Sequence, residues 1–250
     1  MIESDSVLAI GAILAVIAML YSSVGHGGAS GYIAVLALLN VVPDVIRPVA
    51  LSLNVVVAGF ATYRFAKAGF IEWRSALPII LASMPLAFLG GGIALPVEIY
   101  RPLLGGLLVF SALYLLWQTS RSQTRFDVVS RKIPLLGSVG AGAGIGFLSG
   151  LTGIGGGVLL SPLFLISGWA GARQTAGIAA VFILANSVAG LAGNYVVLRS
   201  IPYEILPWSG MVLVGSFIGT SLGVRILPVK PLIWLLAVAV MISGVKFLFL

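Results

Sequence analysis

Two clusters of glycine interrupt long apolar stretches of this chain, and they are the residues best suited to binding a ligand. The first runs from Gly25 to Gly28 around His26, and the second runs from Gly153 to Gly157. Successive glycines release backbone N–H groups from helical pairing and let a ligand approach the chain closely. A helix that begins directly after such a cluster adds the positive end of its dipole. These features predict a site for an oxyanion that binds without meeting a permanently charged arginine or lysine.

Glycine also allows membrane helices to pack closely, and packing is the alternative explanation. Small residues four apart, which favour helix packing, recur at Gly140/Gly144, Gly146/Gly150 and Gly215/Gly219/Gly223. Packing needs about one glycine per helical turn, whereas each cluster carries three or four together, which favours a site. Neither cluster is a nucleotide-binding motif, because no Lys-Ser/Thr pair follows and the glycine spacing differs from the dinucleotide pattern.

Three polar residues in apolar surroundings add to the clusters. His26 could donate a hydrogen bond to an anion or couple proton movement to transport, because imidazole changes charge near neutral pH. Its alternative role is that of an interior histidine with ordinary hydrogen bonds. Asn54 and Asn186 lie deep in apolar segments, where an amide needs a ligand or a neighbouring helix as its partner. The predicted substrate-binding residues are Ser23, Gly25, His26, Gly27, Gly28, Asn54, Thr152, Gly153, Gly155, Gly156, Gly157 and Asn186.

The composition places these residues inside a membrane. Hydrophobic residues make up 60% of the 250 residues and charged residues only 8%, and the mean hydropathy is +1.15. Soluble domains carry about 25% charged residues. The net charge of +7 comes from basic residues scattered at segment ends, so it indicates membrane topology and not nucleic-acid binding. The chain has no cysteine, and no cofactor or metal is expected.

Apolar runs between chain breakers predict an all-α bundle of transmembrane helices. The predicted segments are 7–23, 29–42, 48–66, 75–95, 100–118, 134–151, 156–168, 174–198, 205–226 and 231–250. A span needs about 20 apolar residues, so segments 29–42 and 156–168 are too short to cross comfortably. Each of these two follows a glycine cluster. Arg47 and Arg173 precede the third and eighth segments, as vestibule groups or, more simply, interfacial anchors.

The positions of the basic residues predict an orientation. The acidic N-terminus lacks the basic region of a signal peptide, so the first segment should be retained. If the N-terminus is outside, ten basic residues fall inside and four outside, a clear positive-inside bias. The inside residues are Arg64, Lys67, Arg74, Arg121, Arg125, Arg131, Lys132, Arg173, Arg225 and Lys230, and the outside ones are Arg47, Arg101, Arg199 and Lys246. Residues 119–133 then form a cytoplasmic linker between two repeats, 1–118 and 134–250.

The two halves match at a nearly constant offset, which indicates an internal duplication. Gly25–Gly28 aligns with 153–156 at an offset of 128, and Asn54 then aligns with Asn186 at an offset of 132. Tyr63/Tyr195, Lys67/Arg199, Glu72/Glu204 and 95–97/227–229 continue the series. An odd number of crossings per half gives inverted repeats, as in many secondary transporters. Four crossings per half would give parallel repeats instead.

The second cluster also carries a family resemblance. The stretch from Gly150 to Pro162, GLTGIGGGVLLSP, followed by a basic turn and another apolar helix, resembles the TauE/SafE family of sulfite exporters. Ser22 to Gly28 looks like the degenerate copy of the same motif. The resemblance implies a multi-pass permease of the plasma membrane, typically the bacterial inner membrane, for sulfite, organosulfonates or related small anions. His26, and Gln174 to Gly177 where a Thr-Ser pair is frequent, depart from the family pattern, so it implies anion transport more strongly than sulfite itself.

Other functions fit less well. An intramembrane enzyme needs paired carboxylates, a nucleophile with its base, or metal ligands, and the chain has one histidine and seven acidic residues. A passive anion channel lined by glycine is closer, and a proton-driven flux that saturates would distinguish a carrier from it. The oligomeric state is left open.

Overall fold

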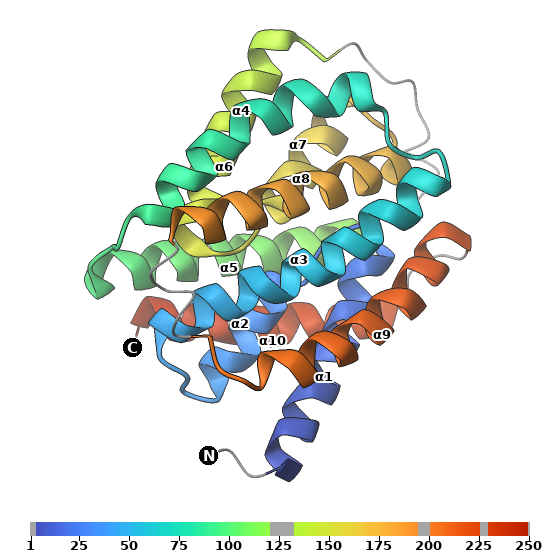
Figure 1. The fold of residues 1–250 in the computed structure, drawn as a ribbon. Coiled ribbons are helices and arrows are strands. Elements are labelled where there is room, and N and C mark those ends of the chain that lie inside the picture. The colour runs from blue at the N-terminus through green and yellow to red at the C-terminus, as the bar shows by residue number, and fades with distance from the viewer. Residues whose placement is uncertain (1–3, 121–132, 195–200, 226–229, 250) are drawn as a thin grey trace.

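The computed structural model describes residues 4–120, 133–194, 201–225 and 230–249, and within these ranges the chain forms helices and turns without strands. The helices are α1 (Ser4–Ser23), α2 (Ala29–Leu38), α3 (Pro43–Lys67), α4 (Trp73–Gly92), α5 (Val97–Ser120), α6 (Leu135–Thr152), α7 (Gly157–Ser167), α8 (Ala172–Gly193), α9 (Ile205–Arg225) and α10 (Lys230–Phe249). They form the bundle drawn in Figure 1. The predicted all-α fold is therefore confirmed.

Each predicted apolar segment corresponds to one helix, because a chain this apolar satisfies its backbone polar groups best within helices. Six helices (α3, α4, α5, α6, α8 and α9) are long and apolar enough to span a membrane. The two short segments become α2, with 10 residues, and α7, with 11 residues. At 1.5 Å per residue these helices extend roughly 15–17 Å, about half of a bilayer core of roughly 30 Å.

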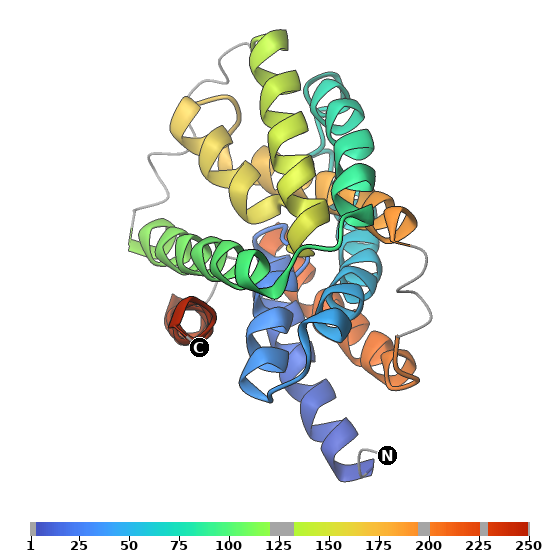
Figure 2. The same cartoon turned by 90° about the vertical axis from the view of Figure 1, so that its left-hand side faces the viewer.

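Helices α3 and α8 pack against each other through the middle of the bundle (Figure 1). Helix α4 packs on α6 and α8, and α9 packs on α1 and α3. Helix α5 packs on α10, and Figure 2 shows this pair along one side of the molecule. The first helix of each half therefore packs on the fourth helix of the other half.

Glycines spaced one turn apart bring these helices close together. On α6, a Cβ atom added to Gly146 or Gly150 would meet the backbone of α4. On α9, Gly215, Gly219 and Gly223 have the same relation to the backbone of α1. The packing role predicted for these glycines fits this geometry. The expectation was wrong for Gly140 and Gly144, where an added Cβ atom would meet nothing within 4 Å.

The apolar core does not follow the division of the sequence into halves. One cluster of buried side chains joins α1, α2, α3 and α5 to α9 and α10, with Tyr32 and Leu53 fully buried in it. A second cluster joins α4 to α7 and α8 around Phe164 and Phe182. Most of the predicted linker 119–133 lies outside the described residues, as do Tyr195, Arg199 and residues 227–229, which were aligned as repeat partners.

Candidate functional site

The two glycine clusters form the turns that lead into the short helices. Gly25 and Gly28 have positive φ angles of 78° and 101° before α2, and Gly153 and Gly156 have φ angles of 82° and 78° before α7. Gly155 adds a further positive φ of 81°. Residues with a Cβ atom are strained in this left-handed region, so the turns need glycine. Gly28 and Gly156 are the N-caps of α2 and α7, and the first N–H groups of a helix lack partners within it.

The two turns meet at Asn54. A Cβ atom added to Gly27 would meet Oδ1 of Asn54, and one added to Gly155 would meet Nδ2 of the same side chain. Asn54 is 0% exposed, yet neither of its amide atoms has a hydrogen-bond partner among the described residues. Buried polar atoms are nearly always hydrogen-bonded in proteins, so an unsatisfied carboxamide between two glycine turns requires an explanation.

Helix α8 contributes to the same region. Ile183 packs against the turns, because Cβ atoms added to Gly27, Gly155 and Gly157 would each meet its side chain. Asn186 follows three residues later, which places it on the same face of α8. Asn186 is also fully buried, and neither of its amide atoms has a partner among the described residues. The alternative was that each asparagine forms hydrogen bonds to a neighbouring helix. Neither makes such a bond in the part of the chain that the structure describes.

Two serine hydroxyl groups are also buried without a hydrogen-bond partner among the described residues. Ser149 on α6 and Ser187 on α8 are 1% and 0% exposed, and neither Oγ atom has a hydrogen-bond partner among the described residues. The Cβ atom of Ser149 lies 3.3 Å from the position of a Cβ atom added to Gly156, so this hydroxyl belongs to the second turn. Each hydroxyl can donate one hydrogen bond to a ligand.

His26 connects the first turn to α7. Its side chain is 2% exposed, with Nδ1 3.1 Å from the Val24 carbonyl oxygen and Nε2 3.1 Å from Oγ of Ser161. The Tyr21 ring lies edge-on to the imidazole, with 6.3 Å between ring centroids. If Nδ1 donates to the carbonyl, Nε2 accepts from Ser161 in the neutral ring and donates to it in the charged ring. His26 thus forms the ordinary hydrogen bonds expected of an interior histidine. The direction of its bond to Ser161 also depends on whether the ring is protonated.

Two predicted hydroxyl groups point elsewhere. Oγ of Ser23 donates to the Leu20 carbonyl oxygen at 2.6 Å, and Oγ1 of Thr152 donates to the Leu148 carbonyl oxygen at 2.7 Å. Each has already used its single proton within its own helix. Side chains that bond their own helix in this way are common in membrane helices.

The first glycine of each cluster lies against a neighbouring helix. A Cβ atom added to Gly25 would meet the backbone of Ala176 at the start of α8. One added to Gly153 would lie 2.9 Å from Cγ of Arg47 near the start of α3. These two glycines fix the turns against α8 and α3, and Gly27 and Gly155 are the ones that reach Asn54.

Arg47 is buried, which corrects its assignment as an interfacial anchor. It is 8% exposed, and its Nη2 donates to the carbonyl oxygens of Gly90 at 2.9 Å, Gly91 at 2.6 Å and Gly150 at 2.5 Å. Its Nη1 donates to the Ile93 carbonyl oxygen at 3.2 Å. These carbonyls lie at the C-terminal ends of α4 and α6, where helices leave acceptors unsatisfied. The cation therefore joins two helix ends beside the second turn.

The contacts of Arg173 agree with the anchor interpretation. Its side chain is exposed, and its guanidinium lies 5.5 Å from the centre of the Phe70 ring. Such a position suits an interfacial cation.

Sequence reasoning missed Ile183 and Ser187. The repeat alignment carried the only signal for Ile183, because it stands three residues before Asn186 as Leu51 stands before Asn54. Ser187 has no polar counterpart, since Val55 occupies the aligned position.

The arrangement supplies hydrogen-bond donors for an anion. Among the described residues, no group of three or more His, Asp or Glu side chains could hold a metal ion. The carboxamides, the hydroxyls and the N-terminal ends of α2 and α7 can all donate hydrogen bonds to an oxyanion.

Comparison with known proteins gives the family. The pattern of the family described as "Sulfite exporter TauE/SafE" matches residues 9–247, nearly the whole chain. The chain belongs to the TauE/SafE family. Over 233 residues it is 40% identical to "Probable membrane transporter protein y4hK" of Sinorhizobium fredii, covering 93% of this chain and 94% of the relative. No solved structure was found to match the chain.

A more distant relative carries a similar name. Over 172 residues this TauE/SafE protein is 26% identical to "Probable membrane transporter protein MJ0441" of Methanocaldococcus jannaschii, covering 66% of this chain and 62% of the relative. The family and the relatives' names, together with six membrane-length helices, make this chain a multi-pass membrane transporter and not an enzyme.

Proposed function

We propose that this protein is a secondary transporter of small sulfur-containing anions such as sulfite or organosulfonates, which bind between the two glycine turns at Asn54. The observation that carries the proposal is the buried, unpartnered carboxamide with Gly27 on one side and Gly155 on the other. A bound oxyanion would supply the missing acceptors for its N–H donors. Asn186 and Ser149 would add donors from α8 and α6.

Charge considerations agree with an anion that binds reversibly. The N-termini of α2 and α7 present partial positive charge without a further charged side chain, whose burial at the membrane centre costs at least about 2.5–3.5 kcal/mol. Arg47 is the buried cation nearest the second turn, and backbone carbonyls already engage its guanidinium. Binding through neutral donors can be weak enough for the substrate to leave on the other side.

The proposal includes an inverted repeat. Exchange of the two halves converts the α4–α6 contact into the α9–α1 contact, and the α4–α8 contact into the α9–α3 contact. The pairs α3–α8 and α5–α10 are each converted into themselves. Gly28 and Gly156, aligned at an offset of 128, are both left-handed N-caps. These equivalences support a two-fold relation between the halves, with the substrate near its axis.

We also propose that His26 couples transport to protons. Its ring joins the first turn to Ser161 on α7, so a change in its charge reverses the direction of a hydrogen bond between the halves. The adjoining titratable side chain is Tyr21. The same contact could only stabilise the fold, and the pH dependence of transport distinguishes the two roles.

The test is transport by the purified protein in liposomes, with labelled sulfite, thiosulfate and simple sulfonates as substrates. Saturable uptake that responds to an imposed proton gradient is expected for a carrier, whereas a passive channel would give flux that does not saturate. Gly27→Val and Gly155→Val should abolish uptake, because the added side chain would occupy the space beside Asn54.

Two glycine variants serve as controls. Gly106→Val on α5 should transport normally, since an added Cβ atom there meets nothing within 4 Å. Gly219→Val should instead weaken the packing of α9 on α1, because its Cβ atom would meet the Met19 carbonyl oxygen. Chromatography in detergent checks the assembly of each variant. Normal uptake by both Gly27→Val and Gly155→Val would refute the shared site.

A further inference from the structure

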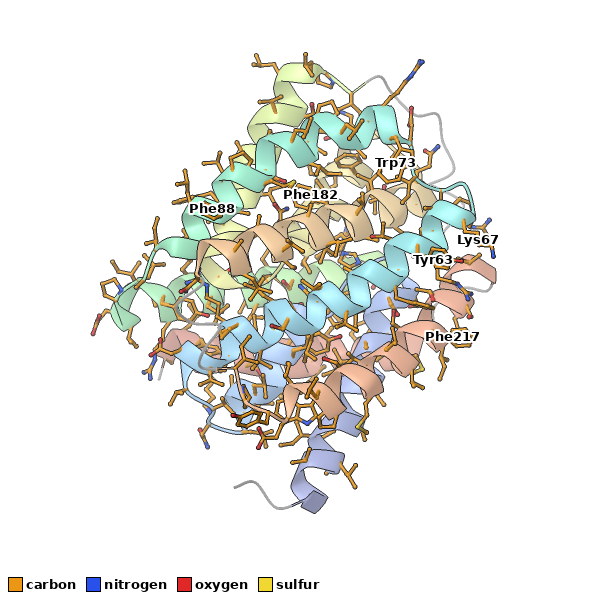
Figure 3. All side chains as sticks on the ribbon, viewed as in Figure 1. Tyr63, Lys67, Trp73, Phe88, Phe182 and Phe217 are labelled. Carbon is orange, nitrogen blue, oxygen red and sulfur yellow. The ribbon has the colours of Figure 1, made fainter. Side chains whose placement is uncertain are left out.

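A groove lies between α3 and α9, away from the turns and from Asn54. It has a volume of about 450 Å³ and is lined by Phe60, Tyr63, Arg64, Lys67, Ala68, Phe217 and Val224. Figure 3 shows Tyr63, Lys67 and Phe217 together at this end of α3 and α9. We propose that the groove binds one anionic glycerophospholipid, with the phosphate at Arg64 and Lys67 and an acyl chain against Phe60 and Phe217.

The groove changes from apolar to basic along α3. Phe60, Arg64 and Lys67 lie on one face of the helix, and they span roughly 10 Å along its axis at 1.5 Å per residue. Lys67 is the last residue of α3, so the basic end lies where the helix leaves the membrane. An anionic lipid has the same order of groups, with a charged phosphate at the interface and hydrocarbon below it.

The arginine is held in place, whereas the lysine is available. Arg64 Nη2 donates to Oγ of Ser221 at 2.9 Å, and its guanidinium lies 5.9 Å from the Phe60 ring centre and 5.4 Å from that of Phe217. Lys67 is exposed and forms no hydrogen bond or ion pair with the described residues. A guanidinium fixed on two rings keeps free N–H groups for a phosphate, and the lysine adds a mobile charge.

Charge complementarity selects an anionic lipid over a neutral one. The residues lining the groove include two cations and no acidic side chain. Tyr63 is 60% exposed and Phe217 is 54% exposed, so the walls present aromatic surface to the lipid phase. Aromatic residues with basic neighbours are typical of the membrane interface. The apolar walls favour a lipid over a soluble phosphate, because only a lipid buries hydrocarbon against them.

The experiment counts lipids bound to the intact protein by native mass spectrometry during titration with dioleoyl phosphatidylglycerol or dioleoyl phosphatidylcholine. We expect one preferred phosphatidylglycerol site that phosphatidylcholine does not fill. Lys67→Gln should weaken it by about fivefold, and the double variant Arg64→Gln/Lys67→Gln by about thirtyfold, from roughly 1 kcal/mol per cation near a lipid surface. Lys67 has no partner among the described residues, so the single variant tests the proposal even if Arg64→Gln lowers stability.

Arg74→Gln is the matched control, because Arg74 is exposed near the start of α4 and does not line the groove. It should bind phosphatidylglycerol as the native protein does. An equal loss in Arg74→Gln, or equal binding of the two lipids, would overturn the proposal. Competition by glycerol 3-phosphate at the lipid's own concentration would also overturn it, because the site would then recognise a soluble phosphate. The proposed binding of substrate at Asn54 does not depend on these outcomes.

Discussion

Replacement of Asn54 by leucine should make the protein more stable and stop transport. Leucine has the same branching at Cγ as asparagine and carries no polar atoms. In the native protein both amide atoms of Asn54 are buried without a partner among the described residues. The substitution removes that desolvation penalty and leaves no new unsatisfied group behind. If Asn54 binds substrate, Asn54→Leu should therefore raise stability. If the carboxamide instead stabilises the fold, the same substitution should lower stability.

The expected increase in the free energy of unfolding follows from the cost of burying amide atoms without partners. A buried polar group without a partner costs about 1–3 kcal/mol, so Asn54→Leu should raise the free energy of unfolding of the substrate-free protein by about 1–3 kcal/mol. For a chain of this length 1 kcal/mol corresponds to roughly 2–4 °C, which gives an increase in Tm of roughly 2–12 °C. Asn186→Leu should behave in the same way, because its amide is equally buried and unpartnered.

The assay measures thermal unfolding in detergent by tryptophan fluorescence and anion uptake in liposomes for the same preparations. Thr220→Val is the control, since its hydroxyl on α9 already donates to the Ser216 carbonyl oxygen at 2.7 Å. This variant should lose about 0.5–1.5 kcal/mol and keep transport. A lower Tm for Asn54→Leu would show that the carboxamide stabilises the fold. Unchanged uptake would remove Asn54 from the substrate site.

Three further predictions concern other parts of the molecule. Arg47→Met should lower the free energy of unfolding by about 1–3 kcal/mol or more, because four carbonyl oxygens lose their donor. Size-exclusion chromatography after heating should show this loss, and an unchanged profile would contradict the buried role. His26→Gln should stay folded while its uptake rate loses the pH sensitivity of the native protein, and a retained pH profile would make His26 structural. Single cysteines at Ser4 and Ser122 should be labelled from opposite sides of intact cells, and same-side labelling would contradict the inverted repeat.

The fold was largely predictable because its strongest determinants are local. Apolar length sets the helices, and the glycine clusters set the breaks before α2 and α7. The breaks could be predicted because left-handed turns at Gly28 and Gly156 need glycine, and glycine is visible in a sequence.

The site was predictable only in part, because its contacts join distant segments. Asn54 stood out as a lone amide in an apolar run, but its position between both turns depends on how the halves pack. Ile183 could not be distinguished from other apolar residues in a chain that is 60% hydrophobic. Arg47 looked like an interfacial cation because its partners are backbone carbonyls, which no sequence pattern reveals.

The first and fourth helices of each half pack on helices of the other half. This packing affects how the protein can fold during its synthesis. Trp208 Nε1 on α9 donates to the Val7 carbonyl oxygen on α1 at 3.0 Å, across 201 residues of chain. At about 5–20 residues per second, α1 waits roughly 10–40 s after leaving the ribosome before α9 arrives. During this time lipid must cover the surface of α1 that α9 later covers. A first half made alone lacks α9, the main packing partner of α1, and both α6 and α8, on which α4 packs. We therefore expect the native packing to form only when both halves are present.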